Sequence, residues 1–287
     1  MSPTILITII SLSLLALISA VILYFVAQKF RIFEDPRIDE IQAMLPAANC
    51  GGCGFAGCRN FAEALVKADT FEGLYCPVGG GTVMGLTAKM LGKEAPVVDP
   101  LAAVLLCNGT PEYRPRTSKY NGASDCRISN SLYIGETDCS YGCMGYGDCV
   151  RACAFDAMYM DSPSELPIII DDKCVACGAC VKACPRNLIE LRKKAKKDRK
   201  IYVACSNCDK GGPARKACKV ACIGCNKCFK VCEFDAITIE NNLAFIDEKK
   251  CTFCRKCAPE CPTNAILELN FPPKKPKAEV QAETVNG

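Results

Sequence analysis

The sequence predicts an α+β protein in which a membrane-spanning helix precedes three small cysteine-rich domains. Three observations support this prediction. The 287-residue chain begins with an uncharged apolar segment, 25 of its residues are Cys, and its second half contains a duplicated pattern of cysteine runs. The chain has no Trp, and few large apolar residues flank each cysteine run. Domains this small are commonly held together by metal ligands, because they cannot build a large core.

The first segment is long enough to cross a membrane. It reads TILITIISLSLLALISAVILYFVA from position 4 to 27 and carries no charge. At about 1.5 Å per residue, a helix of this length crosses a hydrocarbon core of roughly 30 Å. No Lys or Arg precedes the segment, whereas Lys29 and Arg31 follow it, which is the reverse of a cleaved secretory signal. We therefore expect residues 1–32 to be a single-pass anchor in the cytoplasmic (inner) membrane, with the body on the cytoplasmic side.

The absence of His excludes several kinds of site. Zinc sites that mix Cys with His, C-x-x-C-H haem attachment, Rieske centres and Ser-His-Asp or Cys-His nucleophiles all need an imidazole. Cysteines two or three residues apart also rarely have disulfide geometry. Ligation of metal by thiolates is therefore the expected chemistry, and no self-contained catalytic site is expected.

The motif NCGGCGFAGC near the N-terminus predicts a first metal site. Its three cysteines and the next one along the chain have the spacing C-x2-C-x4-C-x17-C, and they are Cys50, Cys53, Cys58 and Cys76. From Arg59 the sequence RNFAEALVKAD has helical periodicity, with Phe61 and Leu65 on one side. This helix carries the chain away and back, so that Cys76 can close the site. We expect one [4Fe–4S] cluster, cluster 1, in a domain at 33–96; the alternative is a glycine-rich turn with free thiols.

An internal duplication organises the second half of the chain. Four cysteine runs, arranged as two consecutive pairs, each end in a cysteine that precedes a short apolar strand pattern. The last cysteine of the first run recurs after 79 residues, and the last cysteine of the second run recurs after 77. Three runs have the spacing C-x2-C-x2-C-x3-C, and the first is stretched to C-x3-C-x5-C-x3-C. The regular spacing is that of bacterial ferredoxins, in which the fourth cysteine binds the neighbouring cluster.

The sequence therefore predicts two tandem two-cluster bacterial-ferredoxin-like domains, at 138–192 and 218–270. If the fourth cysteine of each run crosses to the neighbouring cluster, the ligand sets are Cys139, Cys143, Cys149 and Cys184 for cluster 2; Cys153, Cys174, Cys177 and Cys180 for cluster 3; Cys222, Cys225, Cys228 and Cys261 for cluster 4; and Cys232, Cys251, Cys254 and Cys257 for cluster 5. The alternative is zinc, which also binds four thiolates, but zinc ribbons use two separated pairs and these runs are unbroken.

Five cysteines remain unassigned, and they are Cys107, Cys126, Cys205, Cys208 and Cys218. They lie in or beside a connecting segment at 97–137 and a basic, cysteine-containing insert at 193–217. A sixth metal site, with a cluster or zinc, and buried free thiols both stay open for them. The basic run at 192–200 predicts a solvated face or a docking surface for acidic lipid or protein. No interleaved aromatic residues indicate nucleic-acid binding, and residues 271–287 read as a disordered tail.

At this level of detail the chain resembles the B subunits of the Rnf complex. The likeness rests on the N-terminal apolar helix, NCGGCGFAGC with a distant CP, and the stretched run CSYGCMGYGDCVRAC at 139–153, and it covers residues 1 to about 269. The shorter members of that family carry one ferredoxin-like unit, whereas this chain carries two.

The resemblance implies a membrane oxidoreductase and translocase that couples electron flow between reduced ferredoxin and NAD to the pumping of Na+ or H+. This subunit would take electrons from soluble ferredoxin through five [4Fe–4S] clusters and pass them to other membrane and peripheral subunits. Two alternatives stay open: a polyferredoxin-type reductase that activates a corrinoid protein or another metalloenzyme without pumping ions, and a zinc-stabilised adaptor without a redox role.

Overall fold

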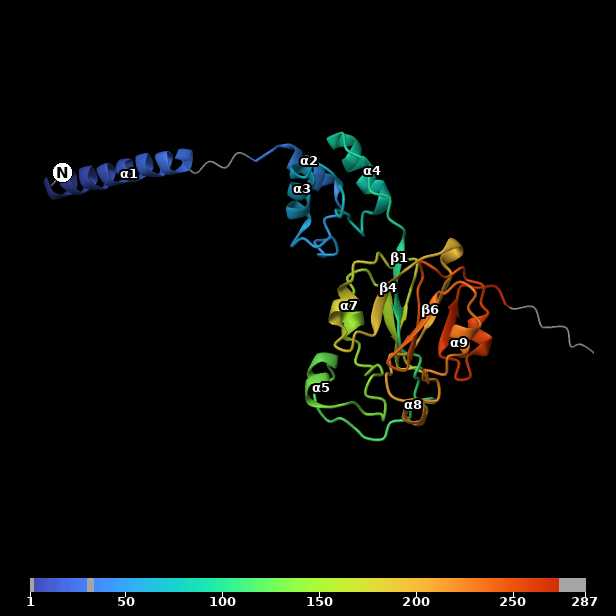
Figure 1. Ribbon diagram of the computed structural model, residues 1–287. Helices are drawn as coiled ribbons and strands as arrows, with labels where there is room; N and C mark the ends of the chain where they lie inside the picture. Colours follow the sequence, from blue (N-terminus) through green and yellow to red (C-terminus); the bar gives the residue numbers. More distant parts are fainter. Residues whose placement is uncertain (1–2, 30–33, 274–287) are drawn as a thin grey trace, which may run out of the picture.

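The structure is a computed structural model that describes residues 3–29 and 34–273 (Figure 1). It contains an isolated N-terminal helix, a small helical domain and a body of short strands and helices, which confirms the α+β fold class. Of the disordered tail expected at 271–287, residues 274–287 lie outside the described residues.

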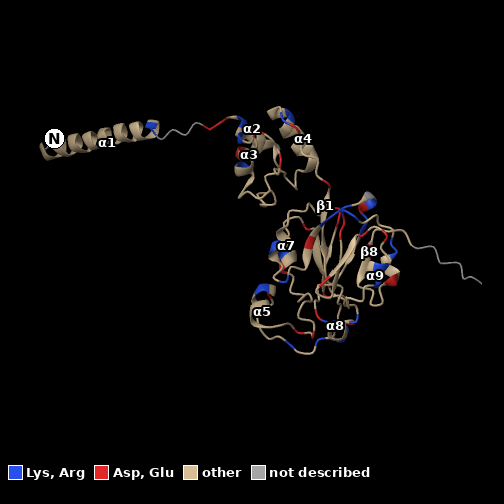
Figure 2. Cartoon of the chain, in the orientation of Figure 1, with Lys and Arg blue, Asp and Glu red and all other residues tan. Residues whose placement is uncertain are grey.

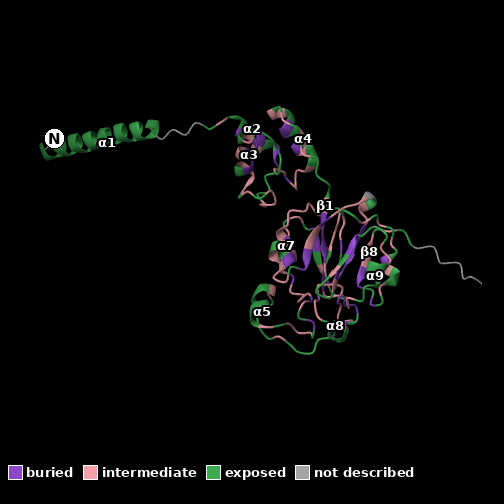
Figure 3. Ribbon diagram, viewed as in Figure 1, coloured by how far each residue is buried: buried purple, intermediate pink, exposed green. Residues whose placement is uncertain are grey.

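The N-terminal helix, α1 (Pro3–Lys29), has no buried residue, and Lys29 in its last turn is its only charged side chain (Figure 2, Figure 3). It is long and apolar enough to cross a membrane. A helix that exposes apolar side chains on every face is stable only in an apolar environment or against a partner. The structure therefore agrees with the membrane anchor expected from the sequence.

The domain that follows is built from α2 (Arg37–Met44), α3 (Cys58–Lys67) and α4 (Gly80–Leu91). As the periodicity predicts, α3 buries Phe61 and Leu65, and these side chains pack with residues of α2 and α4. The left-handed conformation of Gly92 (φ +66°) ends α4. This small core holds the cysteine loop between α2 and α3.

The body contains eight strands in four two-stranded antiparallel sheets. The pairs are β1 (Leu101–Leu105) with β4 (Ile189–Lys193), β2 (Met158–Asp161) with β3 (Leu166–Ile169), β5 (Lys200–Val203) with β8 (Ile266–Leu269), and β6 (Ile237–Glu240) with β7 (Leu243–Ile246). The second four strands repeat the pairing of the first four. We call residues 101–193 unit 1 and residues 200–269 unit 2.

Seven short helical segments connect these strands. They are α5 (Cys126–Leu132), α6 (Asp148–Arg151), α7 (Ala179–Ala183), the 3-10 turn η1 (Lys196–Asp198), α8 (Gly211–Ala217), α9 (Lys227–Lys230) and α10 (Cys257–Glu260). The sequence predicts 97–137 and 193–217 only as a connection and an insert, but each contributes the first strand of a unit. Strands β1 and β5 are short, and only their long-range partners β4 and β8 make them strands.

The two units pack against each other along β1 and β5, in the centre of the body (Figure 3). Val104 of β1, Tyr202 of β5 and Ala204 are buried in one apolar cluster between the units. The backbone N–H of Asn108 donates a hydrogen bond to the carbonyl of Ala204 at 3.1 Å. The units therefore share a continuous interface.

Arg192 of β4 is one of the buried polar residues of this interface. Its side chain is 6% exposed, and it forms an ion pair with Glu190. Its Nη1 donates to the carbonyl of Ile246 in unit 2 at 2.9 Å, and its guanidinium lies 5.8 Å from the ring of Tyr202 and 5.1 Å from that of Phe245. Such contacts require the two units to keep one relative position.

We expect Arg192→Ala to lower the free energy of unfolding by about 2 kcal/mol, because it leaves the partly exposed carboxylate of Glu190 and the carbonyl of Ile246 without their donor and removes a buried side chain from the interface. Urea unfolding of the metal-loaded protein, followed by visible circular dichroism without oxygen, measures this change. The matched control is Lys193→Ala, since Lys193 forms only an exposed pair with Asp99 and its loss should cost less than about 1 kcal/mol. Equal effects of the two substitutions would contradict a structural role for Arg192.

Candidate metal centres

Four hollows in the body are each lined by four cysteines. Their volumes lie between about 300 and 410 Å³. The cysteine sets are Cys222, Cys225, Cys228 and Cys261; Cys232, Cys251, Cys254 and Cys257; Cys126, Cys143, Cys149 and Cys184; and Cys107, Cys139, Cys205 and Cys218. Four thiols around one cavity are the ligand number of a [4Fe–4S] cluster.

The two hollows of unit 2 contain the sets that the sequence predicts for clusters 4 and 5. In each set the fourth cysteine of a run, Cys261 or Cys232, crosses to the cysteines of the other run. Helix α10 ends directly before Cys261, whereas Val231 separates the end of α9 from Cys232, and in each run a turn of four residues then leads from the cysteine into a strand. The structure thus brings these cysteines together, and their binding of iron stays a prediction.

The cysteines expected at clusters 3 and 1 also lie close together. The thiol of Cys180 interacts electrostatically with those of Cys174, Cys177 and Cys153, and burial raises the pKa of Cys180 to about 11.

In the N-terminal domain, Cys76 interacts with Cys53 and Cys50, and Cys58 packs against the same core. Asn49 Oδ1 accepts a hydrogen bond from the backbone N–H of Cys58 at 2.9 Å and so holds the start of α3 against the loop.

Cluster 2 is where the structure differs from the expected ligand set. Cys143, Cys149 and Cys184 line one hollow as expected, but the fourth cysteine there is Cys126, and Cys139 lies elsewhere. The carboxylate of Asp148 accepts hydrogen bonds from the backbone N–H groups of Cys126, at 3.0 Å, and of the following residue, at 3.2 Å. These bonds fix the start of α5 beside Cys149, the residue after Asp148. The hollow beside Cys149 therefore has Cys126 where the spacing predicts Cys139, and which of the two binds cluster 2 stays a prediction.

Cys139 lines the fourth hollow, which we call the interface hollow, together with Cys107, Cys205 and Cys218. Two of these cysteines come from unit 1 and two from unit 2. Asn207 Nδ2 donates to the sulfur of Cys139 at 3.7 Å, across the same interface. Four of the five cysteines left unassigned by spacing thus line hollows, and Cys208 lines none of the four.

Backbone N–H groups point at several of these sulfurs. Leu188 N–H donates to Cys184 Sγ at 3.3 Å, and Ala265 N–H donates to Cys261 Sγ at the same distance and in the equivalent position of unit 2. The interface hollow has the same feature, because Cys107 Sγ accepts from the backbone N–H of Cys143 at 3.4 Å. Hydrogen bonds to cluster ligands adjust reduction potentials, so the interface hollow has the chemistry of the other sites.

Burial makes thiolates costly in these hollows unless a metal neutralises them. It raises the pKa of Cys149, Cys205 and Cys257 to about 12. Because a metal ligand must be deprotonated, a bound cation has to supply the compensating charge at neutral pH. The residues fit this requirement, since each hollow offers four thiols.

The spacing of the side chains favours clusters over zinc. Four thiolates around one zinc ion lie about 3.8 Å apart, given Zn–S bonds of about 2.3 Å. Among residues 3–29 and 34–273, no three Cys, Asp or Glu side chains converge closely enough to hold a single metal ion. A [4Fe–4S] cluster separates its four ligands further than a zinc ion does, and hollows of about 300 to 410 Å³ have room for it.

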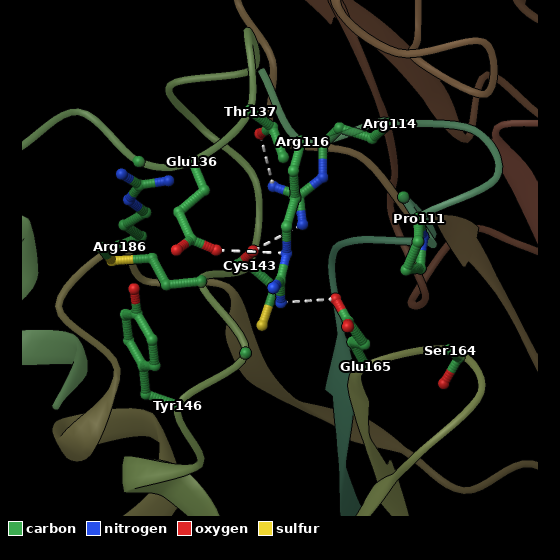
Figure 4. A pocket seen from close by; sticks show the side chains of 14 residues that line it. Pro111, Arg114, Arg116, Glu136, Thr137, Cys143, Tyr146, Ser164, Glu165 and Arg186 are labelled. Atoms are coloured by element: carbon green, nitrogen blue, oxygen red, sulfur yellow. Dashed lines mark hydrogen bonds and ion pairs between the residues drawn. The ribbon is translucent and has the colours of Figure 1, made fainter. Parts of the chain in front are cut away.

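Two guanidinium groups lie beside the loop that carries Cys143 (Figure 4). Arg114 Nη2 donates to the carbonyl of Cys143 and Arg186 Nη1 to that of Gly142, both at 2.6 Å. Burial, followed by the neighbouring charge of Arg114, lowers the pKa of Arg186 from its ordinary value. A third cation in the same cleft, Arg116, is neutralised by two carboxylates. Its Nε lies 3.1 Å from Glu136 Oε2, and its Nη2 lies 2.8 Å from Glu165 Oε2. The unneutralised pair lowers the cost of holding thiolates nearby.

The N-terminal domain contacts unit 1 at a cysteine. A Cβ atom on Gly52 would lie 2.9 Å from Cys177 Cα and 3.0 Å from its carbonyl oxygen, so only glycine fits there. The thiol of Cys177 also interacts electrostatically with that of Cys50. The expected sites of clusters 1 and 3 are therefore direct neighbours across this contact.

Comparison with known proteins agrees with these centres. A family model described as "Putative Fe-S cluster" matches residues 45–70, and two models described as "4Fe-4S dicluster domain" match residues 137–189 and 221–265. These ranges contain the N-terminal loop and most of the cysteines of each ferredoxin-like unit.

Three similar proteins cover most of the chain. The B subunit of the Na(+)-translocating ferredoxin:NAD(+) oxidoreductase complex of Acetobacterium woodii is 41% identical over 89% of this chain and 75% of its own length. The proton-translocating counterpart of Clostridium ljungdahlii is 40% identical over 93% of both chains. The B subunit of the ion-translocating oxidoreductase complex of Methanosarcina acetivorans is 36% identical over 86% of this chain and 91% of its own.

Paired cysteine substitutions test the revised ligand sets. Cys126→Ala and Cys184→Ala should each remove about four irons, and the double substitution should remove no more, because both residues line one hollow. Cys139→Ala combined with Cys184→Ala should remove about eight. Iron and acid-labile sulfide assays on protein purified without oxygen measure these losses.

Cys208→Ala is the matched control and should keep all iron, since Cys208 lines none of the four hollows. If the Cys139–Cys184 pair lost only about four irons and Cys126→Ala lost none, the ligand set expected from spacing would be right instead.

Gly52→Ala should slow electron transfer between the N-terminal domain and unit 1 several-fold, because the new methyl group pushes the backbone of Cys177 away. Rapid-freeze electron paramagnetic resonance, which follows how fast each cluster is reduced, measures this rate. Gly81→Ala is the control, because a Cβ there meets no atom within 4 Å. An unchanged rate in Gly52→Ala would show that this contact does not carry electrons.

Proposed function

Because this chain belongs to the family of B subunits of ion-translocating ferredoxin:NAD(+) oxidoreductase complexes, we propose that it carries electrons along a line of six [4Fe–4S] clusters. It is an iron–sulfur electron-transfer subunit of an oxidoreductase complex of this kind. The observation that supports six clusters is that the interface hollow has four cysteines, as have the hollows of clusters 2, 4 and 5.

The proposed order of the clusters is supported by the thiols of neighbouring sets that lie near enough to interact. The pairs are Cys257 with Cys228, Cys205 with Cys222, Cys143 with Cys107, Cys149 with Cys180, and Cys177 with Cys50. They link cluster 5 to cluster 4, then to the interface cluster, cluster 2, cluster 3 and cluster 1. The interface cluster is the step that joins unit 2 to unit 1. Without it, the two units would be separate electron-transfer modules.

One end of this line lies next to the membrane. The domain of cluster 1 begins at the described residue 34, only a few positions after α1 ends at Lys29, and the other end is cluster 5 in unit 2. Clusters supply one-electron transfer without proton transfer or bond formation. The protein's own part is to hold the thiolates, exclude water from them and set their spacing, which suits a chain without His.

The partners proposed are soluble ferredoxin at one end and other subunits of the complex at the other. The names of the relatives contain both ferredoxin and NAD(+). Because this sequence has no dinucleotide-binding motif, we assign the reduction of NAD to another subunit. Lys29 at the end of α1 supports a body on the cytoplasmic side. The relatives from Acetobacterium and Clostridium are named for different ions, Na(+) and proton.

Metal analysis of the full chain, purified without oxygen, tests this function. Six clusters give about 24 irons with equal sulfide, and reduced ferredoxin should bleach their visible absorption. About 20 irons would mean that the interface hollow holds no cluster. Zinc without sulfide, or clusters that ferredoxin does not reduce, would contradict the electron-transfer function.

A further inference from the structure

The internal duplication provides a comparison between two equivalent corners of the body. Cys177 and Cys254 are the second cysteines of the equivalent runs CVACGAC in unit 1 and CTFCRKC in unit 2. Cys177 is half-buried, whereas Cys254 is exposed, and Cys225 is the only other exposed cysteine of the 25. Since all 25 lie within the described residues, the second unit has the most accessible thiols in the protein.

What covers Cys177 is another cluster-binding domain. Gly52, in the loop that carries Cys50 and Cys53, lies against the Cα and carbonyl oxygen of Cys177. The fold therefore contains one example of how an iron–sulfur domain docks on this corner of a ferredoxin-like unit. The equivalent corner of unit 2 has no such domain within the described residues.

The two corners differ in charge. The unit 1 segment 172–179 reads DKCVACGA and has one acidic and one basic residue, whereas the unit 2 segment 249–256 reads KKCTFCRK and has four basic residues and no acidic one. Lys249, Lys250 and Lys256 are exposed. Lys256 pairs with Glu233, but both side chains are about half exposed or more, so this pair is weak and leaves the lysine available.

An apolar side chain lies among these charges. Phe234 is 43% exposed and lines the same hollow as Cys254 and Lys256. An accessible ligand, a partly exposed aromatic ring and a basic rim form the usual anatomy of a transient docking surface. We call residues 249–256 together with Phe234 the basic corner.

We propose that the basic corner is the docking site of a small, acidic iron–sulfur electron carrier, which places its cluster against Cys254 as the N-terminal domain does against Cys177. This rests on the proposed function, because it assumes that the cysteines of unit 2 hold clusters. Three exposed lysines, Lys249, Lys250 and Lys256, steer a partner of opposite charge and orient it during encounter, whereas Arg255 is paired with Glu268. Cluster 5 lies here, at the end of the line farthest from cluster 1, so electrons that arrive at this corner pass every other cluster.

The test reverses three charges at the corner of the full chain in detergent. The variant is Lys249→Glu, Lys250→Glu and Lys256→Glu, and the matched control is Lys210→Glu, Arg215→Glu and Lys216→Glu, whose three residues are exposed at α8. The probe is an acidic bacterial ferredoxin with two [4Fe–4S] clusters. Binding is measured as Kd by calorimetry without oxygen, and electron transfer as the second-order rate of reduction by the reduced ferredoxin.

At low ionic strength we expect the corner variant to raise Kd and lower the reduction rate by about tenfold or more, and the control to change both by less than about twofold. The difference should shrink in about 0.5 M salt, which screens the charges. Reduction by a small viologen, which needs no docking site, should not slow, and the iron content should match the unchanged protein.

Two outcomes would overturn the proposal. If the unchanged protein is reduced by ferredoxin and the corner variant behaves like the control, ferredoxin docks elsewhere and only the docking site is wrong. If the unchanged protein is reduced by the viologen but neither binds ferredoxin nor accepts its electrons, the proposed function itself fails.

Discussion

The burial of thiols is the physical constraint on which the rest of this structure depends. Each unit has only short strands and helices of a few residues around its cysteines, and no Trp to build a core. Thiolates in such places are unstable without compensating charge, as the raised pKa of Cys149 and Cys205 indicates. Metal binding then supplies folding free energy as well as redox chemistry. The same bonds that hold the units together therefore determine where electrons can go.

The interface between the two units extends this principle. Val104, Tyr202 and Ala204 pack the units together, and Arg192 adds a buried polar contact. The interface hollow takes two cysteines from each side, so a cluster bound there would link the units covalently through its metal–sulfur bonds. A cluster in this place would serve rigidity and electron transfer together, because transfer between clusters needs a fixed and short separation.

Duplication also produced a useful asymmetry. At Cys177 the N-terminal domain occupies the corner of unit 1, and Gly52 permits the close approach. At Cys254 the corresponding corner is accessible, and its neighbours in sequence are basic. Two units with the same pairing of strands therefore have different surroundings: one is covered by the N-terminal domain, and the other has the accessibility and charge that suit an external carrier.

The sequence by itself determined the anchor helix, the amphipathic helix α3, the duplication and the family, because these depend on local composition, periodicity and spacing. It also predicted the quartets of unit 2, where regular spacing leaves one geometry. Only the tertiary structure decided that Cys126 lies beside Cys149 and that Cys139 joins Cys107, Cys205 and Cys218. The reason is physical: a stretched run no longer fixes where its thiols point, and hydrogen bonds and packing between residues distant in sequence, such as Asp148 with Cys126, then decide it.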